Sequence, residues 1–179
     1  MLLIACSTPP LSMQLQPELA ANQPSRPLTN KADWGIGSQD QRIAQYLIEI
    51  TKGEGAATLV NESQSSRLII ENTLQQQWSK NGIRFTADST DKINIQLIKL
   101  LTKVEQNPLS HKINSTIVIK VELSTKGKVF SKTFRSRFTK EGPFSADIKK
   151  TGKQLNIQLS QLLTEIVQDP QLNAKLKQL

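Results

Sequence analysis

Apolar and polar residues alternate between positions 113 and 123, and this period of two constrains the fold more than any other feature of the chain. It predicts a β-strand with one buried face and one polar face. A tight turn is expected at residues 126–128, and the next strand carries three phenylalanines on one face. The apolar residues of the two strands are Ile113, Ile117, Ile119, Val121, Leu123, Phe130, Phe134 and Phe138.

A third strand precedes these two, and its alternation is interrupted. Ile93, Ile95 and Leu97 alternate with polar residues, but the apolar positions then shift to Ile98 and Leu100. Such a shift of parity indicates a β-bulge or a change of face. Together the three strands predict an antiparallel meander.

Residues 65–81 have the period of an α-helix. Ile70, Leu74 and Trp78 recur every four residues, and Gly82 follows where a helix would end. Because these three apolar side chains fall on one face, we expect the helix to pack on the sheet.

A longer helix is predicted near the C-terminus, after the meander. Asp169-Pro170 has the order of a cap followed by proline, which predicts a short terminal helix. The apolar stripe of the longer helix comprises Ile148, Leu155, Leu159, Leu162, Leu163 and Ile166.

The complete pattern predicts an α+β fold, an antiparallel sheet with two main helices packed on one face. Short strands at residues 34–37 and 43–50, around a turn at 37–40, and a further strand at 57–60 precede the first helix. The expected order is therefore strands, helix, three-strand meander, helix and a short C-terminal helix. The opposite face of the sheet is open to water or a partner and carries Thr116, Lys120, Glu122, Ser131, Thr133, Arg135 and Arg137.

The only cysteine, Cys6, closes the tetrapeptide Leu3-Ile4-Ala5-Cys6, which has the form of a bacterial lipoprotein box. We expect its thiol to be diacylated and Cys6 to become the mature N-terminus; the alternative is a cytosolic protein with an incidental cysteine. Ser7 is not the aspartate that retains lipoproteins at the inner membrane. The prediction is a protein anchored in the outer membrane by its lipid, palmitate included, and facing the periplasm.

Three segments follow from this assignment. Residues 1–6 are the remnant of a signal peptide with the lipobox, and residues 32–179 form a single α+β domain. Residues 7–31 are rich in Pro, Gln and Ser and lack an apolar period, which predicts a flexible tether. About 25 flexible residues have a root-mean-square reach of about 25–30 Å.

The formal net charge of +8 is concentrated late in the chain. Residues 126–153 hold nine lysines and arginines against two acidic residues, which indicates a basic surface that attracts anions or serves only solubility. At residues 141–144, Glu141 and Phe144 could contact a partner, or Gly142-Pro143 could simply turn the strand while Phe144 fills the core. The candidate partner or anion-binding residues are Lys128, Lys132, Arg135, Arg137, Lys140, Glu141 and Phe144.

Catalytic chemistry has little support in the sequence. The single histidine, His111, falls in an expected loop between strands and has no second histidine or cysteine cluster with which to bind a metal. The glycines form neither a phosphate-binding loop nor a dinucleotide fingerprint. We therefore expect no enzyme activity, no metal and no cofactor, and no nucleic-acid binding because no recognition motif is present.

Several segments resemble the YajG-type lipoprotein family. They are the run from Ser65 to Ile83, Lys126-Gly127-Lys128, the stretch from Phe134 to Ala146, and Asp40-Gln41-Arg42. The resemblance extends from Cys6 nearly to the C-terminus. It implies an outer-membrane lipoprotein of a Gram-negative bacterium and supplies no reaction.

Three functions are compatible with these features. The preferred hypothesis is a lipid-anchored, non-catalytic binding or accessory module that contacts an envelope protein, lipopolysaccharide or peptidoglycan. The second is a carrier of an apolar ligand, with a cavity lined by residues such as Phe134, Leu155 and Leu159. The third is an envelope hydrolase in which His111 or Glu141 converges with other polar groups in a cleft.

Overall fold

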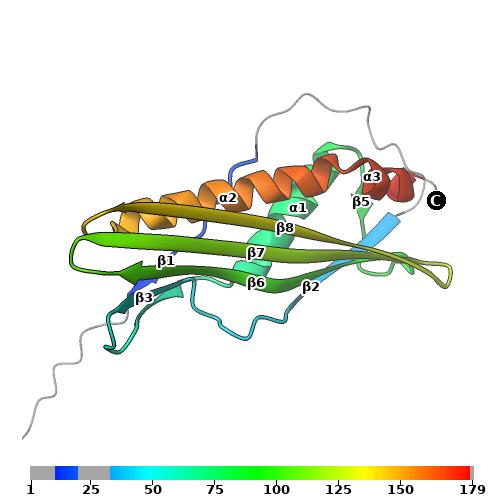
Figure 1. The fold of residues 1–179 in the computed structure, drawn as a ribbon. Coiled ribbons are helices and arrows are strands. Elements are labelled where there is room, and N and C mark those ends of the chain that lie inside the picture. Colours follow the sequence, from blue (N-terminus) through cyan, green and yellow to red (C-terminus); the bar gives the residue numbers. More distant parts are fainter. Residues whose placement is uncertain (1–10, 20–32, 178–179) are drawn as a thin grey trace, which may run out of the picture.

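The computed structural model describes residues 11–19 and 33–177, which form eight strands and three helices (Figure 1). The strands are β1 (Ser12–Met13), β2 (Asp33–Asp40), β3 (Ile48–Lys52), β4 (Thr58–Glu62), β5 (Arg84–Phe85), β6 (Lys92–Gln106), β7 (Ser110–Thr125) and β8 (Lys128–Pro143). The helices are α1 (Ser66–Lys80), α2 (Ile148–Gln168) and α3 (Pro170–Lys177). Within the described residues, no helix is long and apolar enough to cross a membrane.

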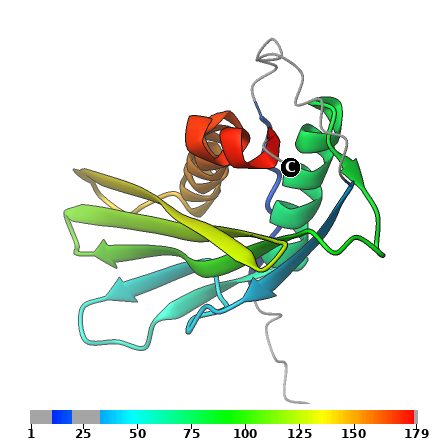
Figure 2. The same cartoon turned by 90° about the vertical axis from the view of Figure 1, so that its right-hand side faces the viewer.

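The sheet is mixed and curled, so the predicted antiparallel sheet with two helices on one face is wrong. Four of the seven strand pairings are parallel: β1 with β4, β2 with β5, and both β2 and β3 with β6. The antiparallel pairs are β3 with β4, β6 with β7 and β7 with β8. Figure 2 shows the sheet curling, with the three helices on the inner side of the curl.

Long-range pairing along β6 accounts for this difference. One edge of β6 pairs with β7 along its length, while the other is divided between two parallel strands. β2 pairs with residues 92–97 and β3 with residues 102–106. Parallel neighbours need a crossover connection, here the segment containing α1. The predicted turn at 37–40 is also wrong, since these residues lie inside β2.

Local features of the sequence correspond closely to the structure. α1 covers residues 66–80 of the predicted 65–81, and Gly82 follows it with a φ of +95°, as expected of a C-terminal glycine. The pairing of β6 with β7 shifts register between Leu97 and Lys99, which confirms the bulge. Lys126 and Gly127 have φ values of +45° and +76° and form the predicted tight turn.

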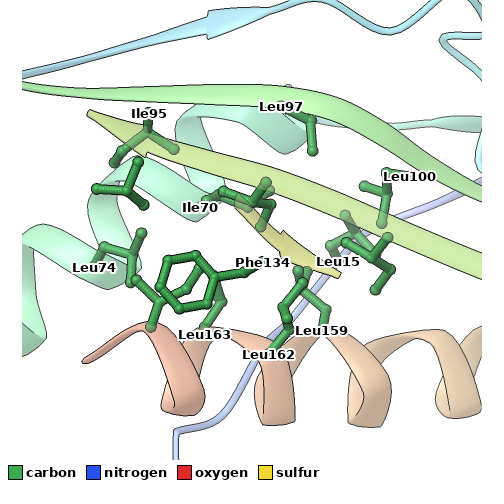
Figure 3. Packing of buried hydrophobic residues seen from close by; sticks show 14 of the residues in the cluster. Leu15, Ile70, Leu74, Ile95, Leu97, Leu100, Phe134, Leu159, Leu162 and Leu163 are labelled. Atoms are coloured by element: carbon green, nitrogen blue, oxygen red, sulfur yellow. The ribbon is translucent and has the colours of Figure 1, made fainter. Parts of the chain in front are cut away.

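One hydrophobic core lies between the sheet and the helices (Figure 3). Trp34 of β2 and Trp78 of α1 are completely buried, and Phe134 of β8 is 2% exposed. The apolar stripe of α2 faces the same core through Leu155, Leu159, Leu162, Leu163 and Ile166. Full burial of such side chains stabilises the fold by roughly 1.5–3 kcal/mol each.

Residues 11–19, within the range predicted as a tether, lie against the domain. β1 pairs with β4, and the side chain of Leu15 is 2% exposed in the core. The backbone N–H of Gln16 donates to Asn156 Oδ1 of α2 at 2.7 Å, and that of Glu18 to Ser160 Oγ at 2.9 Å. This N-terminal segment is thus bound to β4 and α2. Cys6 and the rest of the predicted tether lie outside the described residues.

Candidate functional site

Most of the candidate partner residues lie on β8. Because successive side chains of a strand point to opposite faces of the sheet, these residues do not share one face. Arg135, Arg137 and Glu141 lie on the outer face of the sheet and are exposed. Lys132 and Lys140 have the opposite parity, shared with Phe134 and Phe138. Lys128 lies at the β7–β8 turn, and Phe144 follows the other end of the strand. The seven residues therefore form four groups rather than one site.

Lys132 contributes to the fold rather than to the exposed charge. Its ammonium group lies 2.6 Å from Asp169 Oδ2 at the junction of α2 and α3, and it donates to Gln171 Oε1 at 3.1 Å. It also lies 5.6 Å from the centre of the Phe134 ring. These contacts fix the edge strand β8 to the C-terminal helices.

Arg135 and Arg137 form the basic part of the outer sheet face. They lie opposite Val118 and Thr116 of β7, and within the described part of the chain neither forms a salt bridge. On the same face, Glu122 is bound by Lys120 at 3.3 Å, and Glu141 by Lys112 at 3.2 Å. The two guanidinium groups consequently leave a local excess of positive charge.

The loop after β8 holds Phe144 away from the core. Its N–H donates to Leu109 O at 2.9 Å, and its carbonyl accepts from His111 Nδ1 at 2.8 Å. The backbone has a φ of +57°, an uncommon conformation for a bulky residue, and the side chain is 68% exposed. The interpretation in which Phe144 fills the core is therefore wrong.

His111 lies in β7 rather than in a loop, which corrects its predicted position. Its imidazole ring packs directly on Gly142. A Cβ atom added to that glycine would lie only 2.7 Å from His111 Cε1. A side chain at position 142 would displace the ring. His111 and Gly142 together support the loop that presents Phe144.

A surface groove of about 450 Å³ lies between the start of β7, the end of β8 and the start of α2. It brings His111 and Glu141 together, as the hydrolase hypothesis requires, but both have structural partners.

Asp147 caps α2 by accepting from the N–H of Lys150 at 3.1 Å, and this hydrogen bond lowers the pKa of Asp147. In the described ranges, no cluster of three His, Cys, Asp or Glu side chains could hold a metal ion.

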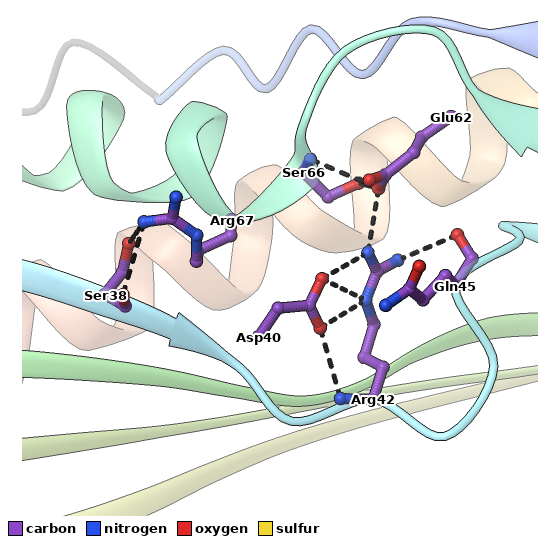
Figure 4. Close-up of polar contacts among 7 residues, drawn as sticks. All are labelled: Ser38, Asp40, Arg42, Gln45, Glu62, Ser66 and Arg67. Atoms are coloured by element: carbon purple, nitrogen blue, oxygen red, sulfur yellow. Dashed lines mark hydrogen bonds and ion pairs between the residues drawn. The ribbon is translucent and has the colours of Figure 1, made fainter.

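A buried polar cluster is centred on Arg42 and was not predicted from the sequence (Figure 4). The Arg42 side chain is 1% exposed and lies 2.7 Å from Asp40 Oδ2 and 2.8 Å from Glu62 Oε2. Glu62 also accepts from the N–H of Ser66 at 3.2 Å, in the first turn of α1. The cluster joins β2, β4 and α1 and has a structural role. The only hint of this cluster in the sequence was the segment Asp40-Gln41-Arg42, which places an acidic and a basic residue two positions apart.

Acid should weaken this cluster. The hydrogen bond from the Arg42 guanidinium holds the pKa of Asp40 below its ordinary value of 3.8. The stabilisation is thus fully present above the unfolded-state pKa and is lost as the pH falls below about 4, through the folded-state pKa.

Asp40→Asn should therefore lower stability at pH 7 and flatten the acid limb of the pH–stability curve. Urea unfolding across a pH series measures both effects. Asp88→Asn, at an exposed position, is the control. Equal slopes for the wild type and Asp40→Asn would contradict the assignment.

Comparison with known proteins places the chain in a family. The family described as "Uncharacterized lipoprotein" matches residues 18–177. The chain belongs to this lipoprotein family. The uncharacterized lipoprotein YajG of Escherichia coli K12 is 24% identical over 180 residues, which cover 99% of this chain and 92% of the relative. YajG of Escherichia coli O6:H1 matches with the same values. The resemblance to YajG-type lipoproteins is confirmed.

Solved structures share the fold. The crystal structure of a Xanthomonas campestris protein has a TM-score of 0.61 and 16% identity, covering 92% of this chain and 96% of that protein. The crystal structure of an uncharacterized protein has a TM-score of 0.50 and 11% identity, covering 90% and 99%. At these identities the similarity describes the fold alone. The lipoprotein family indicates a membrane-anchored envelope protein.

Proposed function

We propose that this lipoprotein is a non-catalytic binding module, anchored in the outer membrane by a lipid on Cys6 and facing the periplasm. Its outer sheet face around Arg135 and Arg137 binds an anionic partner of the envelope. The observation that carries the binding role is the pair of exposed arginines that, in the described structure, lack acidic partners.

The anchor is supported by the sequence before the domain and by the family. Cys6 is the only cysteine and ends a lipobox, and the family consists of lipoproteins. Ser7 follows the cysteine, so the aspartate that signals inner-membrane retention is missing. An unpaired cysteine in an exported protein also requires a use, and lipidation provides one.

The arginine pair suits a partner with closely spaced anionic groups. Residues two apart on one strand point to the same face and lie about 7 Å from each other. Guanidinium groups bind phosphates and carboxylates in a bidentate manner, which lysine does not do. The phosphates of lipopolysaccharide, the carboxylates of peptidoglycan and acidic protein surfaces all offer this chemistry.

The carrier hypothesis is less well supported. Phe134, Leu155 and Leu159 are 2%, 1% and 0% exposed and belong to the packed core, in which Figure 3 labels Phe134 and Leu159. Three surface grooves of the described residues are lined by other side chains. The hydrolase hypothesis is weaker too, since the imidazole and the carboxylates of its groove are engaged in structural contacts.

Charge reversal tests the arginine pair. Arg135→Glu with Arg137→Glu should reduce binding to lipopolysaccharide, to peptidoglycan or to a partner crosslinked in envelopes by tenfold or more, equivalent to at least about 1.4 kcal/mol. Binding of the wild type should also weaken as salt rises, because the Debye length is only about 10 Å at 0.1 M.

The matched control reverses two lysines on the same hairpin, Lys126→Glu with Lys128→Glu, at the far end of β8. It changes the net charge equally and should leave most of the binding intact. Equal losses in the two double variants would show an effect of net charge alone and contradict the proposed face.

A further inference from the structure

The chain between Cys6 and the domain is short. Leu11 is already bound, since its carbonyl accepts from the N–H of Asn61 at 2.8 Å. Only five residues lead from Cys6 to Leu11, and a fully extended chain of that length spans at most about 18 Å. A lipid on Cys6 would thus hold the domain beside the membrane, nearer than the reach of the predicted tether.

The N-terminal segment enters the domain beside the first turns of α2. Met13 packs on Gly152, because a Cβ on that glycine would lie 3.1 Å from Met13 Cε. Figure 1 shows β1, the start of α2 and the β6–β7 connection at the same end of the molecule. The β7–β8 turn lies at the opposite end. Anchoring therefore brings the end with the start of α2 toward the bilayer.

Two large apolar side chains in the loops at that end are strongly exposed. Leu109 is 78% exposed in the β6–β7 connection, and Phe144 is 68% exposed. The hydrogen bond from Phe144 N–H to Leu109 O ties the two loops together. Phe144 is also held at positive φ, a strained conformation that its two backbone hydrogen bonds maintain. The fold exposes these side chains, although leucine and phenylalanine are more often buried in folded proteins.

Three lysines lie within six residues of Phe144 in the chain, and two of them, Lys140 and Lys150, line the groove beside Pro143 and Ser145. Lys140, Lys149 and Lys150 are exposed, and within the described residues none of them forms a salt bridge. The nearby carboxylates are engaged, Asp147 as the cap of α2 and Glu141 with Lys112. Exposed aromatic and leucine side chains together with unpaired lysines match the interface of an anionic bilayer, where apolar groups enter the headgroup region.

We infer that Leu109, Phe144, Lys140, Lys149 and Lys150 form a membrane-contact tip that rests on the anionic phospholipid surface carrying the anchor. The inference uses the proposed lipid on Cys6 to set the distance to the membrane. Contact at the tip orients the domain, so that the bilayer lies at this end and the arginine pair on the sheet face stays accessible to a partner.

A chemical anchor tests the tip without depending on lipidation in cells. Because Cys6 is the only cysteine, the full unlipidated chain can be coupled through its thiol to a maleimide lipid. The vesicles contain phosphatidylethanolamine and phosphatidylglycerol with brominated acyl chains, which quench tryptophan that enters the bilayer. Trp34 and Trp78 are fully buried and give a constant background.

Phe144→Trp should lose emission and shift to the blue on these vesicles, and Leu109→Trp should do the same as a second reporter. Val129→Trp is the matched control, because Val129 lies near the other end of β8 and is 64% exposed. It should keep its emission. Adding Lys149→Glu and Lys150→Glu to the Phe144→Trp variant should reduce the quenching of its new indole.

Two results would overturn the inference. If the Phe144→Trp and Leu109→Trp variants both keep full emission, the tip does not touch the bilayer and is free for a protein partner. If the Val129→Trp variant is quenched as strongly as the Phe144→Trp variant, the domain has no preferred orientation. Failure of native lipidation would affect neither result, so it remains distinguishable from failure of the tip.

Discussion

Cys6→Ala, in a chain expressed with a complete export signal, should leave the membrane fraction and be recovered in the soluble periplasmic extract. The alanine cannot be acylated, and each methylene withdrawn from the bilayer costs about 0.8 kcal/mol. Two acyl chains of about 15 methylenes each would contribute roughly 24 kcal/mol, which is enough for stable anchoring. Fractionation of cells followed by immunoblotting measures the distribution.

The membrane-contact tip should not rescue this variant. Its two apolar side chains offer only about 1.5–3 kcal/mol each, even if fully buried. Ser7→Ala, next to the anchor, is the control and should remain in the membrane fraction. Persistent membrane retention of Cys6→Ala would contradict lipid anchoring at this position and favour the incidental cysteine.

Leu159→Ala should destabilise the fold by about 2–5 kcal/mol, the usual cost of a leucine-to-alanine cavity in a packed core. Leu159 is fully buried on the face of α2 that meets the sheet. Ile157→Ala on the same helix is the matched control, because Ile157 is 51% exposed, and its cost should be about 0.5 kcal/mol or less. Urea unfolding of both variants gives the comparison.

This pair of variants also separates a packed core from a ligand cavity. Leu159 was one of the residues expected to line a cavity in a carrier of apolar ligands. A wall residue that already faces empty space would lose few contacts on truncation. Nearly equal costs for Leu159→Ala and Ile157→Ala would therefore revive the carrier hypothesis and contradict the packing described for α2.

Sequence periodicity predicted the elements of this fold better than their arrangement. α1, the bulge after Leu97 and the turn at Lys126 and Gly127 depend on neighbours within a few residues, so the sequence carries their signal directly. The parallel pairing of β2 with β6 joins segments more than 50 residues apart. An alternating pattern is the same in a parallel and an antiparallel strand, so it contains no information about this partner.

The candidate site was predictable to a similar degree. Alternation along β8 correctly predicted that Arg135 and Arg137 face away from the core. It could not predict that Lys132 would bind Asp169, because that contact depends on where α2 ends relative to the sheet. The exposure of Phe144 was hidden for the same reason, since its conformation is fixed by His111, 33 residues earlier in the chain.

Mass spectrometry of the native protein, extracted from envelopes, tests the central claim of a lipid-anchored module most directly. We expect the N-terminal peptide to begin at Cys6 and to carry a diacylglyceryl group on its sulfur. An unmodified Cys6 thiol, within a peptide that still contains the residues before it, would contradict lipid anchoring.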